Sequence, residues 1–397
     1  MSDSLYLYFD GLEYPLQLTE CEYLTNYFSV LFPEWAYQVG QHNDNPIISI
    51  RFERDAYYLT TSWDEEVKRY TDKVDILCAL IAALALANSF TDLNALHLHA
   101  ASVIINDRLV VFPSQYRAGK SFLTACLVAE GHLYSGDDVL PICLDNFKGR
   151  AAGFAPRLRL PLPTTTDKKS KSFIESHTAI QGKRYSYLGL GDECKVARND
   201  LFDIGAFVLL ERENGIDAQL EELPVATIFQ QLVKQNFARE VDGSRVLLAL
   251  TEAVSNAQCI KLRYDRADDA VKLLTEHFSS WPCQQVHFPS ELDTSHLNDK
   301  TTRTVEEDCF AQNQQVQKIR IEGESFLASP DGKAIYHLNQ IGSGIWELLS
   351  LPTSKELIIS TLIIAFPQVE KSTIEHDVTQ ILTALQFKGL VVSGDFQ

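Results

Sequence analysis

The stretch that decides the fold is SQYRAGKS, residues 114–121. It follows an apolar run at residues 109–112 and precedes residues 121–129, whose apolar side chains recur at helical spacing. This order predicts a strand, a loop and a helix. Such a loop binds phosphate when small residues let backbone N–H groups converge, a lysine reaches the β and γ oxygens, and a hydroxyl ligates Mg²⁺. The closing GKS supplies these elements, so the stretch is a candidate phosphate site.

The candidate loop departs from the usual phosphate-binding pattern at its start. Where the pattern needs glycine, the chain has Ser114, preceded by Pro113. The alternative is a surface loop that carries GKS by chance, but the flanking strand and helix favour the nucleotide interpretation. On that interpretation the nucleotide-binding residues are Ser114, Gln115, Tyr116, Arg117, Ala118, Gly119, Lys120, Ser121 and Phe122.

An acidic pair, Asp137-Asp138, follows the predicted helix and precedes an apolar strand. Beside a phosphate, one carboxylate can complete the Mg²⁺ shell while the other accepts the proton of an attacking hydroxyl. The tripeptide Gly136-Asp137-Asp138 is also common in β-turns, so a purely structural role stays open.

Composition and charge limit the class of partner. The 397 residues include 53 acidic and 35 basic side chains, for a net charge of -18, and 45% of them are hydrophobic. This balance fits a folded protein and argues against binding of nucleic acid or anionic membrane by bulk charge. Only residues 91–160 escape the acidic excess, with seven basic and six acidic side chains. Any phosphate must therefore be bound locally.

Cysteine usage and apolar runs predict a soluble, cytoplasmic protein. The eight cysteines include no C-x-x-C pair, which argues against a zinc ribbon or a disulfide scaffold. The N-terminus carries acid where a secretory signal carries Lys or Arg. The longest apolar run, residues 76–87, is shorter than a membrane span.

The pattern of strands, helices and loops predicts four parts. Residues 1–73 form a small β-rich module and residues 74–279 an α/β part that contains the candidate loop. Residues 280–315, which lack periodicity, form a linker, and residues 316–397 form a C-terminal module.

Three features of the middle part follow from its sequence. Residues 74–90 are apolar nearly all round, which predicts a helix buried between layers. Residues 164–195 are polar and rich in lysine, which predicts a mobile loop, and its residues 168–171 could close over phosphate. Residues 206–210 and 218–223 flank Glu213-Asn214-Gly215, which predicts a β-hairpin.

Several motifs occur in the order found in the HPr kinase/phosphorylase family. They are His97-Leu98-His99-Ala100-Ala101, Leu109-Val110-Val111-Phe112, Gly119-Lys120-Ser121, Glu130-Gly131-His132 and Asp137-Asp138-Val139. Residues 97–143 closely resemble the catalytic core of that family. The resemblance implies a P-loop α/β core of the PEP-carboxykinase-like type and a kinase that uses ATP and Mg²⁺.

The same resemblance implies a role for each motif residue. Lys120 would bind the β and γ phosphates, and Ser121 and Asp138 would hold Mg²⁺. Asp137 would act as the general base on the acceptor hydroxyl, with Asp138 and His99 as neighbours that orient it or the metal.

The chain departs from the family after the loop as well. Phe122 stands where the family has an acidic residue, and the family's later signature for phosphorolysis is not found. Arg157 and Arg159 could contact phosphate or substrate, or could lie on an exposed strand edge.

The C-terminal module resembles a PqqD-like domain. The resemblance is carried by Leu338-Asn339 before a predicted helix, Ile345-Trp346 within it, and Gly389-Leu390-Val391 in a final strand. It implies a winged-helix-like module that recognises ribosomally made, modified peptides and binds the leader peptide as an added strand. A packing or oligomerisation module is the alternative.

Together these features predict a phosphotransferase that phosphorylates a Ser/Thr hydroxyl of a peptide or small protein captured by residues 316–397. One alternative is a small-molecule kinase, and another is a catalytically degenerate peptide-binding scaffold. The sequence leaves open whether ATP, GTP or pyrophosphate is the donor, and whether the chain forms a homo-oligomer.

Overall fold

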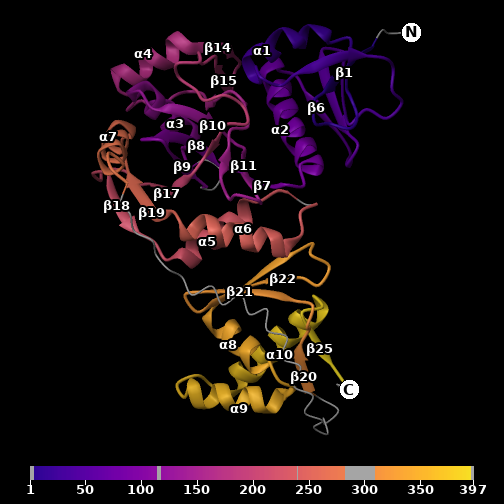
Figure 1. Cartoon of the computed structure of the whole chain (residues 1–397), viewed down its shortest axis with the longest axis vertical. Helices are drawn as coiled ribbons and strands as arrows, with labels where there is room; N and C mark the ends of the chain where they lie inside the picture. The colour runs from indigo at the N-terminus through magenta and orange to yellow at the C-terminus, as the bar shows by residue number, and fades with distance from the viewer. Residues whose placement is uncertain (1–3, 114–117, 239, 282–308, 395–397) are drawn as a thin grey trace. The chain divides into compact units, whose positions relative to one another are not determined.

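The computed structural model describes residues 4–113, 118–238, 240–281 and 309–394. It is a mixed α/β structure with several sheets (Figure 1). The chain separates into two compact units, and the division falls inside helix α6, Gly243–Ser255. The first unit holds the residues before 241 and those from 249 to 286, and the second holds 241–248 and the C-terminal part. The finer division of the first unit at residue 73 stays a prediction.

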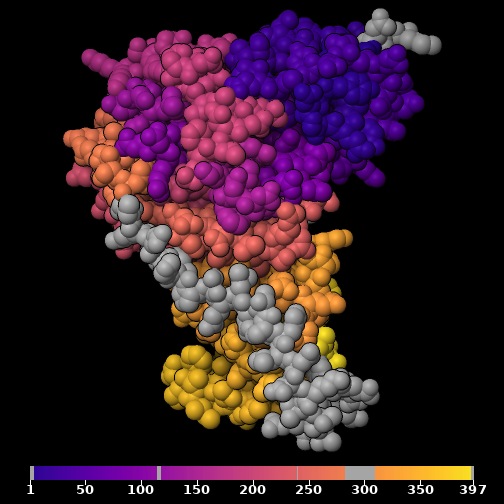
Figure 2. Space-filling view, in the orientation of Figure 1, coloured from indigo at the N-terminus to yellow at the C-terminus, as the bar shows by residue number. Residues whose placement is uncertain are grey.

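The N-terminal part is a six-stranded sheet with the order β3-β1-β2-β4-β5-β6. The strands are Ser4–Phe9 (β1), Leu16–Thr19 (β2), Tyr37–Gly40 (β3), Ile48–Glu53 (β4), Ala56–Thr61 (β5) and Asp64–Tyr70 (β6), with short helices Glu22–Tyr27 (η1) and Phe28–Leu31 (α1) between β2 and β3. These residues form one continuous indigo mass in the space-filling view (Figure 2). Their apolar faces share a core with helix α2, Lys73–Thr91.

Helix α2 confirms the buried helix expected at residues 74–90. Its first turn is capped by the Asp72 carboxylate, which accepts hydrogen bonds from Val74 N and Asp75 N. It is longer than the apolar run because it includes polar residues at both ends. Among the described helices it alone is long and apolar enough to cross a membrane, with a mean hydropathy of 1.9 over 18 residues. Half of that window is buried inside the structure.

The central sheet has the order β10-β8-β9-β17-β19-β18. Its strands are Ala101–Ile105 (β8), Arg108–Phe112 (β9), Leu133–Gly136 (β10), Ile204–Arg212 (β17), Gln219–Glu222 (β18) and Gln258–Tyr264 (β19). Strand β17 is parallel to both β9 and β19, so the carboxyl ends of these three strands meet at one edge. Helices α3, Lys120–Glu130, and α7, Ala267–His277, pack in the same core as this sheet.

The predicted hairpin between residues 206–210 and 218–223 is wrong. Both segments are strands, but β19 lies between them, parallel to β17 and antiparallel to β18. The apolar strand β17 is buried over most of its length, whereas β18 is polar and partly exposed. The apolar strand therefore takes a central position, and the polar one takes the edge.

The mobile loop expected at residues 164–195 is also wrong. It contains helix α4, Lys168–His177, and strands β14, Thr178–Gln181, and β15, Tyr185–Leu188, which pair with β13, Arg157–Arg159. The Asp167 carboxylate caps α4 by accepting a hydrogen bond from Ser170 N, 3.0 Å away. The buried Ile174 anchors the helix in a small core with α3, so the lysine-rich face is only the solvent side of an ordered helix.

The remaining elements of the first unit surround the central sheet. A four-stranded sheet has the order β16-β12-β11-β7. Its strands are Ala95–Leu98 (β7), Leu140–Cys143 (β11), Gly149–Arg150 (β12) and Leu201–Phe202 (β16), and helix α5 spans Val225–Gln235. Strands β7 and β8 follow one another closely in the sequence but lie in different sheets.

The second unit contains two three-stranded sheets, β24-β20-β25 and β21-β22-β23. The strands are Cys309–Gln312 (β20), Gln317–Ile321 (β21), Glu324–Ala328 (β22), Ile335–Leu338 (β23), Thr353–Ser354 (β24) and Val391–Ser393 (β25), and the helices are Gln340–Leu348 (α8), Lys355–Ala365 (α9) and Lys371–Phe387 (α10). Trp346 is 1% exposed at the centre of the core. The Asn339 side chain caps α8 by accepting a hydrogen bond from Gly342 N.

Replacing Asp167 by Ala should loosen the first turn of α4, because losing a helix cap costs about 1 kcal/mol. We expect hydrogen exchange of the Ser170 amide to be about fivefold faster in Asp167→Ala. The exposed Asp145, replaced by Ala, is the control and should leave this exchange unchanged. Equal Ser170 exchange in Asp167→Ala and the wild type would contradict the capping role.

Candidate functional site

The candidate loop connects the end of β9 to the start of α3, the position that its sequence predicted. Residues Ser114, Gln115, Tyr116 and Arg117 lie outside the described residues. Gly119 is the N-cap of α3 and has a left-handed backbone, with φ of 93°. A Cβ atom there would lie 3.0 Å from the Tyr264 hydroxyl, so both backbone and space favour glycine.

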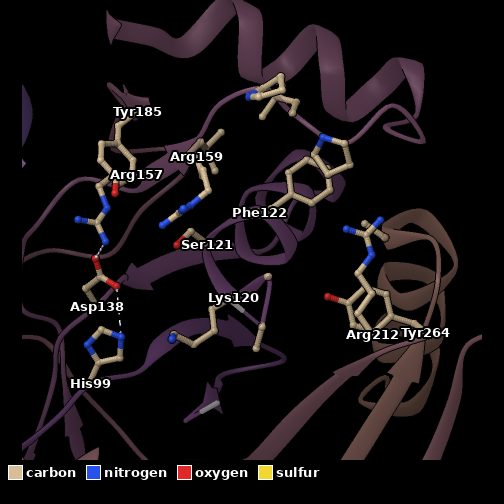
Figure 3. A pocket seen from close by; sticks show the side chains of 17 residues that line it. His99, Lys120, Ser121, Phe122, Asp138, Arg157, Arg159, Tyr185, Arg212 and Tyr264 are labelled. Carbon is tan, nitrogen blue, oxygen red and sulfur yellow. Dashed lines mark ion pairs between the residues drawn. The ribbon is translucent and has the colours of Figure 1, made fainter. Parts of the chain in front are cut away.

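A cavity of about 450 Å³ opens beside the start of α3 (Figure 3). Its polar lining includes a lysine, a hydroxyl, a carboxylate and three arginines, and its remaining lining is apolar or aromatic. The lining residues are His99, Ala118, Gly119, Lys120, Ser121, Phe122, Asp138, Arg157, Leu158, Arg159, Pro161, Leu162, Pro163, Tyr185, Arg212, Tyr264 and Ala267.

The carboxylate of Asp137 is buried beside this cavity and is 3% exposed. The Ser121 hydroxyl donates a hydrogen bond to its Oδ1 at 2.9 Å, and Arg157 N donates to its Oδ2 at 3.1 Å. Asp137 thus joins the first turn of α3 to the start of β13.

The carboxylate of Asp138 lines the cavity instead. Its Oδ2 lies 2.5 Å from Arg157 Nη2, and its Oδ1 lies 3.6 Å from His99 Nε2. Asp138 has a left-handed backbone, with φ of 64°, so two successive aspartates can present their side chains differently. The two aspartates therefore have distinct surroundings.

Burial perturbs the protonation of three groups at the site. It raises the pKa of Asp137 to about 7, and the neighbouring charge of Asp138 adds to this effect. Burial lowers the pKa of Lys120, although both aspartates oppose the shift. Burial and the Lys120 charge lower the pKa of His99, so its imidazole is favoured in the neutral form.

The guanidinium groups of the two candidate arginines both lie near one aromatic ring. The guanidinium carbon of Arg157 is 5.0 Å from the ring centre of Tyr185, and that of Arg159 is 5.6 Å away. Burial opposes the charge of Arg157, but Asp138 and the other acidic groups around it together outweigh burial and raise the pKa of that guanidinium. Both side chains line the cavity, where positive charge suits phosphate or carboxylate groups.

The predicted residues that line the cavity are His99, Ala118, Gly119, Lys120, Ser121, Phe122, Asp138, Arg157 and Arg159. Asp137 does not line the cavity, but it is hydrogen-bonded to two of these residues, Ser121 and Arg157. The other histidine of the strand motif, His97, is separated from it: it is fully buried, and its Nε2 lies 3.5 Å from Asp92 Oδ2.

Sequence reasoning missed three polar or aromatic side chains of the lining, Tyr185, Arg212 and Tyr264. Arg212 and Tyr264 are the last residues of the parallel strands β17 and β19. They reach the cavity because carboxyl ends of parallel strands meet at the edge where α/β folds bind ligands. The carboxyl ends of two apolar strands could have indicated these residues. The wrong hairpin prediction instead paired residues 206–210 with 218–223, so the parallel pairing of β17 with β19 was not recognised.

Comparison with known proteins identifies the C-terminal module. Residues 324–391 match the family model described as coenzyme PQQ synthesis protein D (PqqD). This module is PqqD-like. The prediction for the C-terminal part is therefore confirmed over these residues, and no curated protein matches the chain.

Two solved structures are among the similar ones. One, TbiB1 in complex with the TbiA(beta) leader peptide, is 26% identical, with 22% of this chain and 99% of that chain covered and a TM-score of 0.20. The other, the HPr(Ser) kinase/phosphatase from Coxiella burnetii, is 14% identical, with 46% of this chain and 96% of that chain covered and a TM-score of 0.25.

The matched residues include strands β22, β23 and β24 and helices α8, α9 and α10, and they end at the first residue of β25. In the three-stranded sheet of the C-terminal module that contains β22, this strand is central and pairs with β21 and β23 on either side. Strands β21 and β23 are therefore the edges of this sheet.

The raised pKa of Asp137 predicts a pH-dependent stability. In the unfolded chain the Asp137 carboxyl has a pKa of about 4, and in the folded chain a pKa of about 7. Between these two pH values the folded chain keeps the Asp137 proton and the unfolded chain loses it. The contribution of Asp137 is full below this window and is lost as pH rises, at up to about 1.4 kcal/mol per pH unit. Asp137→Asn should remove this contribution from urea unfolding measured across the window.

Asp145→Asn is the control for this experiment, because Asp145 is exposed. It should follow the wild-type dependence on pH. An Asp137→Asn variant whose free energy of unfolding changes with pH as steeply as that of the wild type would exclude the assigned pKa shift.

Proposed function

We propose that the first unit is an ATP- and Mg²⁺-dependent kinase with an HPr-kinase-like P-loop core. We further propose that the PqqD-like module, with a winged-helix-like fold, captures a peptide or small protein whose Ser/Thr hydroxyl is phosphorylated. The observation that carries the proposal is one cavity containing Lys120, Ser121 and Asp138 at the edge where three parallel strands end. The association of kinase and peptide-binding module suggests a role in peptide modification.

The nucleotide phosphates would lie over the first turn of α3. The N-terminus of a helix offers free backbone N–H groups and favours negative charge, and Lys120 is the first residue of α3. Arg157 and Arg159 add positive charge to the wall. These groups would neutralise the transferred phosphoryl group, which carries most of the charge in such reactions.

The residues present fit a Mg²⁺ ion, because this ion prefers oxygen ligands and few protein carboxylates. The Ser121 hydroxyl supplies such an oxygen, and Asp137 Oδ1, which accepts the hydrogen bond of that hydroxyl at 2.9 Å, orients it. When bound, the ion would neutralise charge on the β and γ phosphates.

The acceptor proton needs a carboxylate that faces the cavity. The sequence prediction gives this role to Asp137, which is buried and already accepts two hydrogen bonds. The burial of Asp137 supports a positioning role for it, with Asp138 as the base that takes the hydroxyl proton. His99, neutral and 3.6 Å from Asp138, would orient that carboxylate. The hydroxyl oxygen then forms the new P–O bond as ADP leaves.

The PqqD-like module would bind the acceptor by strand addition. An extended peptide can pair with an exposed sheet edge, where main-chain hydrogen bonds give affinity and side-chain pockets give selectivity. Capture of one part of the peptide raises the local concentration of its hydroxyl at the cavity. The catalytic site then needs little affinity of its own for the acceptor.

Calorimetry with Mg-ATP tests the nucleotide site of the full chain. We expect binding by the wild type and a loss of affinity of about tenfold or more in Lys120→Ala, which removes a charge-assisted contact to phosphate. Lys272→Ala, an exposed lysine on α7, is the control and should bind normally. An absence of binding by the wild type at high micromolar Mg-ATP would favour the scaffold alternative, which the non-glycine start of the loop supports.

Binding of a fluorescent peptide, made from any short reading frame found next to the gene, tests the acceptor site. A proline has no backbone N–H to donate, so on an edge strand it prevents pairing with an added strand. We expect Tyr336→Pro or His337→Pro in β23, or Arg320→Pro in β21, to weaken binding at the edge that the peptide uses. Lys120→Ala should bind the peptide normally. Full affinity in all three proline variants would leave a small-molecule acceptor as the better account.

A further inference from the structure

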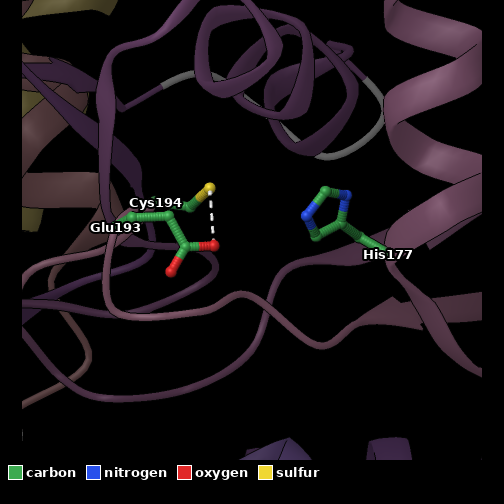
Figure 4. Close-up of side chains that lie close together, drawn as sticks. All are labelled: His177, Glu193 and Cys194. Carbon is green, nitrogen blue, oxygen red and sulfur yellow. Dashed lines mark hydrogen bonds between the residues drawn. The ribbon is translucent and has the colours of Figure 1, made fainter.

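A second group of candidate ligands lies in the first unit, apart from the cavity. His177, Glu193 and Cys194 each offer one ligand atom, and these atoms lie within 4.8 Å of one another (Figure 4). His177 is the last residue of α4, and the other two follow β15. Two segments of the chain thus bring together an imidazole, a carboxylate and a thiol.

The imidazole of His177 is oriented for a ligand. Its Nδ1 lies 2.8 Å from the carbonyl oxygen of Phe173, which accepts the Nδ1 proton. This bond leaves the lone pair on Nε2, and Figure 4 shows that nitrogen facing Cys194. Metal-binding histidines commonly have this arrangement, in which a backbone carbonyl fixes the ring and its tautomer.

The Cys194 thiol lies beside the Glu193 carboxylate, and no basic side chain of the described residues is paired with that carboxylate. Cys194 Sγ donates to Glu193 Oε1 at 3.8 Å, and burial and the Glu193 carboxylate raise the pKa of the thiol. Among the ion pairs of the described residues, none involves Glu193. The carboxylate folds back over Gly191, where a Cβ atom would lie 2.3 Å from Glu193 Oε2.

The backbone holds both segments at fixed positions. Gly189 N donates a hydrogen bond to His177 O at 2.8 Å, which connects the segment after β15 to the end of α4. Tyr134 N donates to Cys194 O at 2.8 Å, and Val196 N donates to Tyr134 O at 3.0 Å. The group is therefore attached to β10, the strand that leads to Asp137.

We propose that His177, Glu193 and Cys194 bind a Zn²⁺ ion, with water as the fourth ligand. Thiolate, imidazole and carboxylate are the ligands of zinc sites, and three protein ligands plus water is a common arrangement. The bond lengths of tetrahedral zinc place ligand atoms about 3.3–3.8 Å apart. Side-chain rotations that move each ligand atom by about 1 Å would bring the three atoms to this spacing. Binding releases the Cys194 proton to solvent.

The ion would join the end of α4 to the segment after β15. That segment follows Tyr185, whose ring lies near Arg157 and Arg159, so the ion would stabilise one wall of the cavity. This role is structural and does not depend on the proposed kinase activity.

Titration of the metal-free full chain with Co²⁺, and then Zn²⁺, tests the site. We expect one Co²⁺ per chain and a near-ultraviolet absorption band from a thiolate ligand, which Zn²⁺ abolishes by displacement. Cys194→Ser should lose the band, and His177→Ala and Glu193→Gln should bind about tenfold or more weakly. The matched controls, Cys143→Ser and His277→Ala, should behave as the wild type.

The Glu193→Gln variant should fold normally, because this side chain is exposed and its replacement is isosteric. A loss of Co²⁺ affinity in this variant therefore cannot be attributed to misfolding. Absence of the thiolate band in the wild type would overturn the proposal. So would a band that persists in Cys194→Ser, or normal Co²⁺ affinity in a folded Glu193→Gln variant.

Discussion

The hydrogen bond between the Ser121 hydroxyl and the buried Asp137 carboxylate is the interaction on which the site depends. The same carboxylate also accepts a hydrogen bond from Arg157 N, so it connects the first turn of α3, the end of β10 and the start of β13. Burying a carboxylate is unfavourable, and the raised pKa of Asp137 reflects that cost. A buried carboxylate with a raised pKa, placed where three segments of the chain meet, is typical of a functional site.

The position of Asp137 also determines what its neighbour can do. With Asp137 turned into the protein, the left-handed backbone of Asp138 directs the second carboxylate to the cavity, beside Arg157 and His99. One aspartate thus maintains the geometry, and the other is available to a substrate. This separation explains how adjacent residues of the same type can have different roles in the proposed reaction.

Much of this arrangement was predictable from sequence because its signals are local. The strand, loop and helix around Gly119 and the Asp137-Asp138 pair follow from periodicity and motif spacing. The order of β17, β19 and β18 did not, because strand pairing depends on burial across the sheet, and Glu213-Asn214-Gly215 gives a strong local hairpin signal. Helix α4 was missed for a similar reason: Ile174 and the Asp167 cap outweigh its polar composition.

The central claim is that a captured peptide hydroxyl receives phosphate in the cavity beside Asp138. Mass spectrometry of a peptide that binds the PqqD-like module, after incubation with the full chain and Mg-ATP, tests it most directly. The account predicts a mass gain of one phosphate on a Ser or Thr with the wild type, reduced about 10²-fold or more in rate with Asp138→Asn. A peptide that binds the chain but stays unmodified, while Mg-ATP also binds, would contradict it.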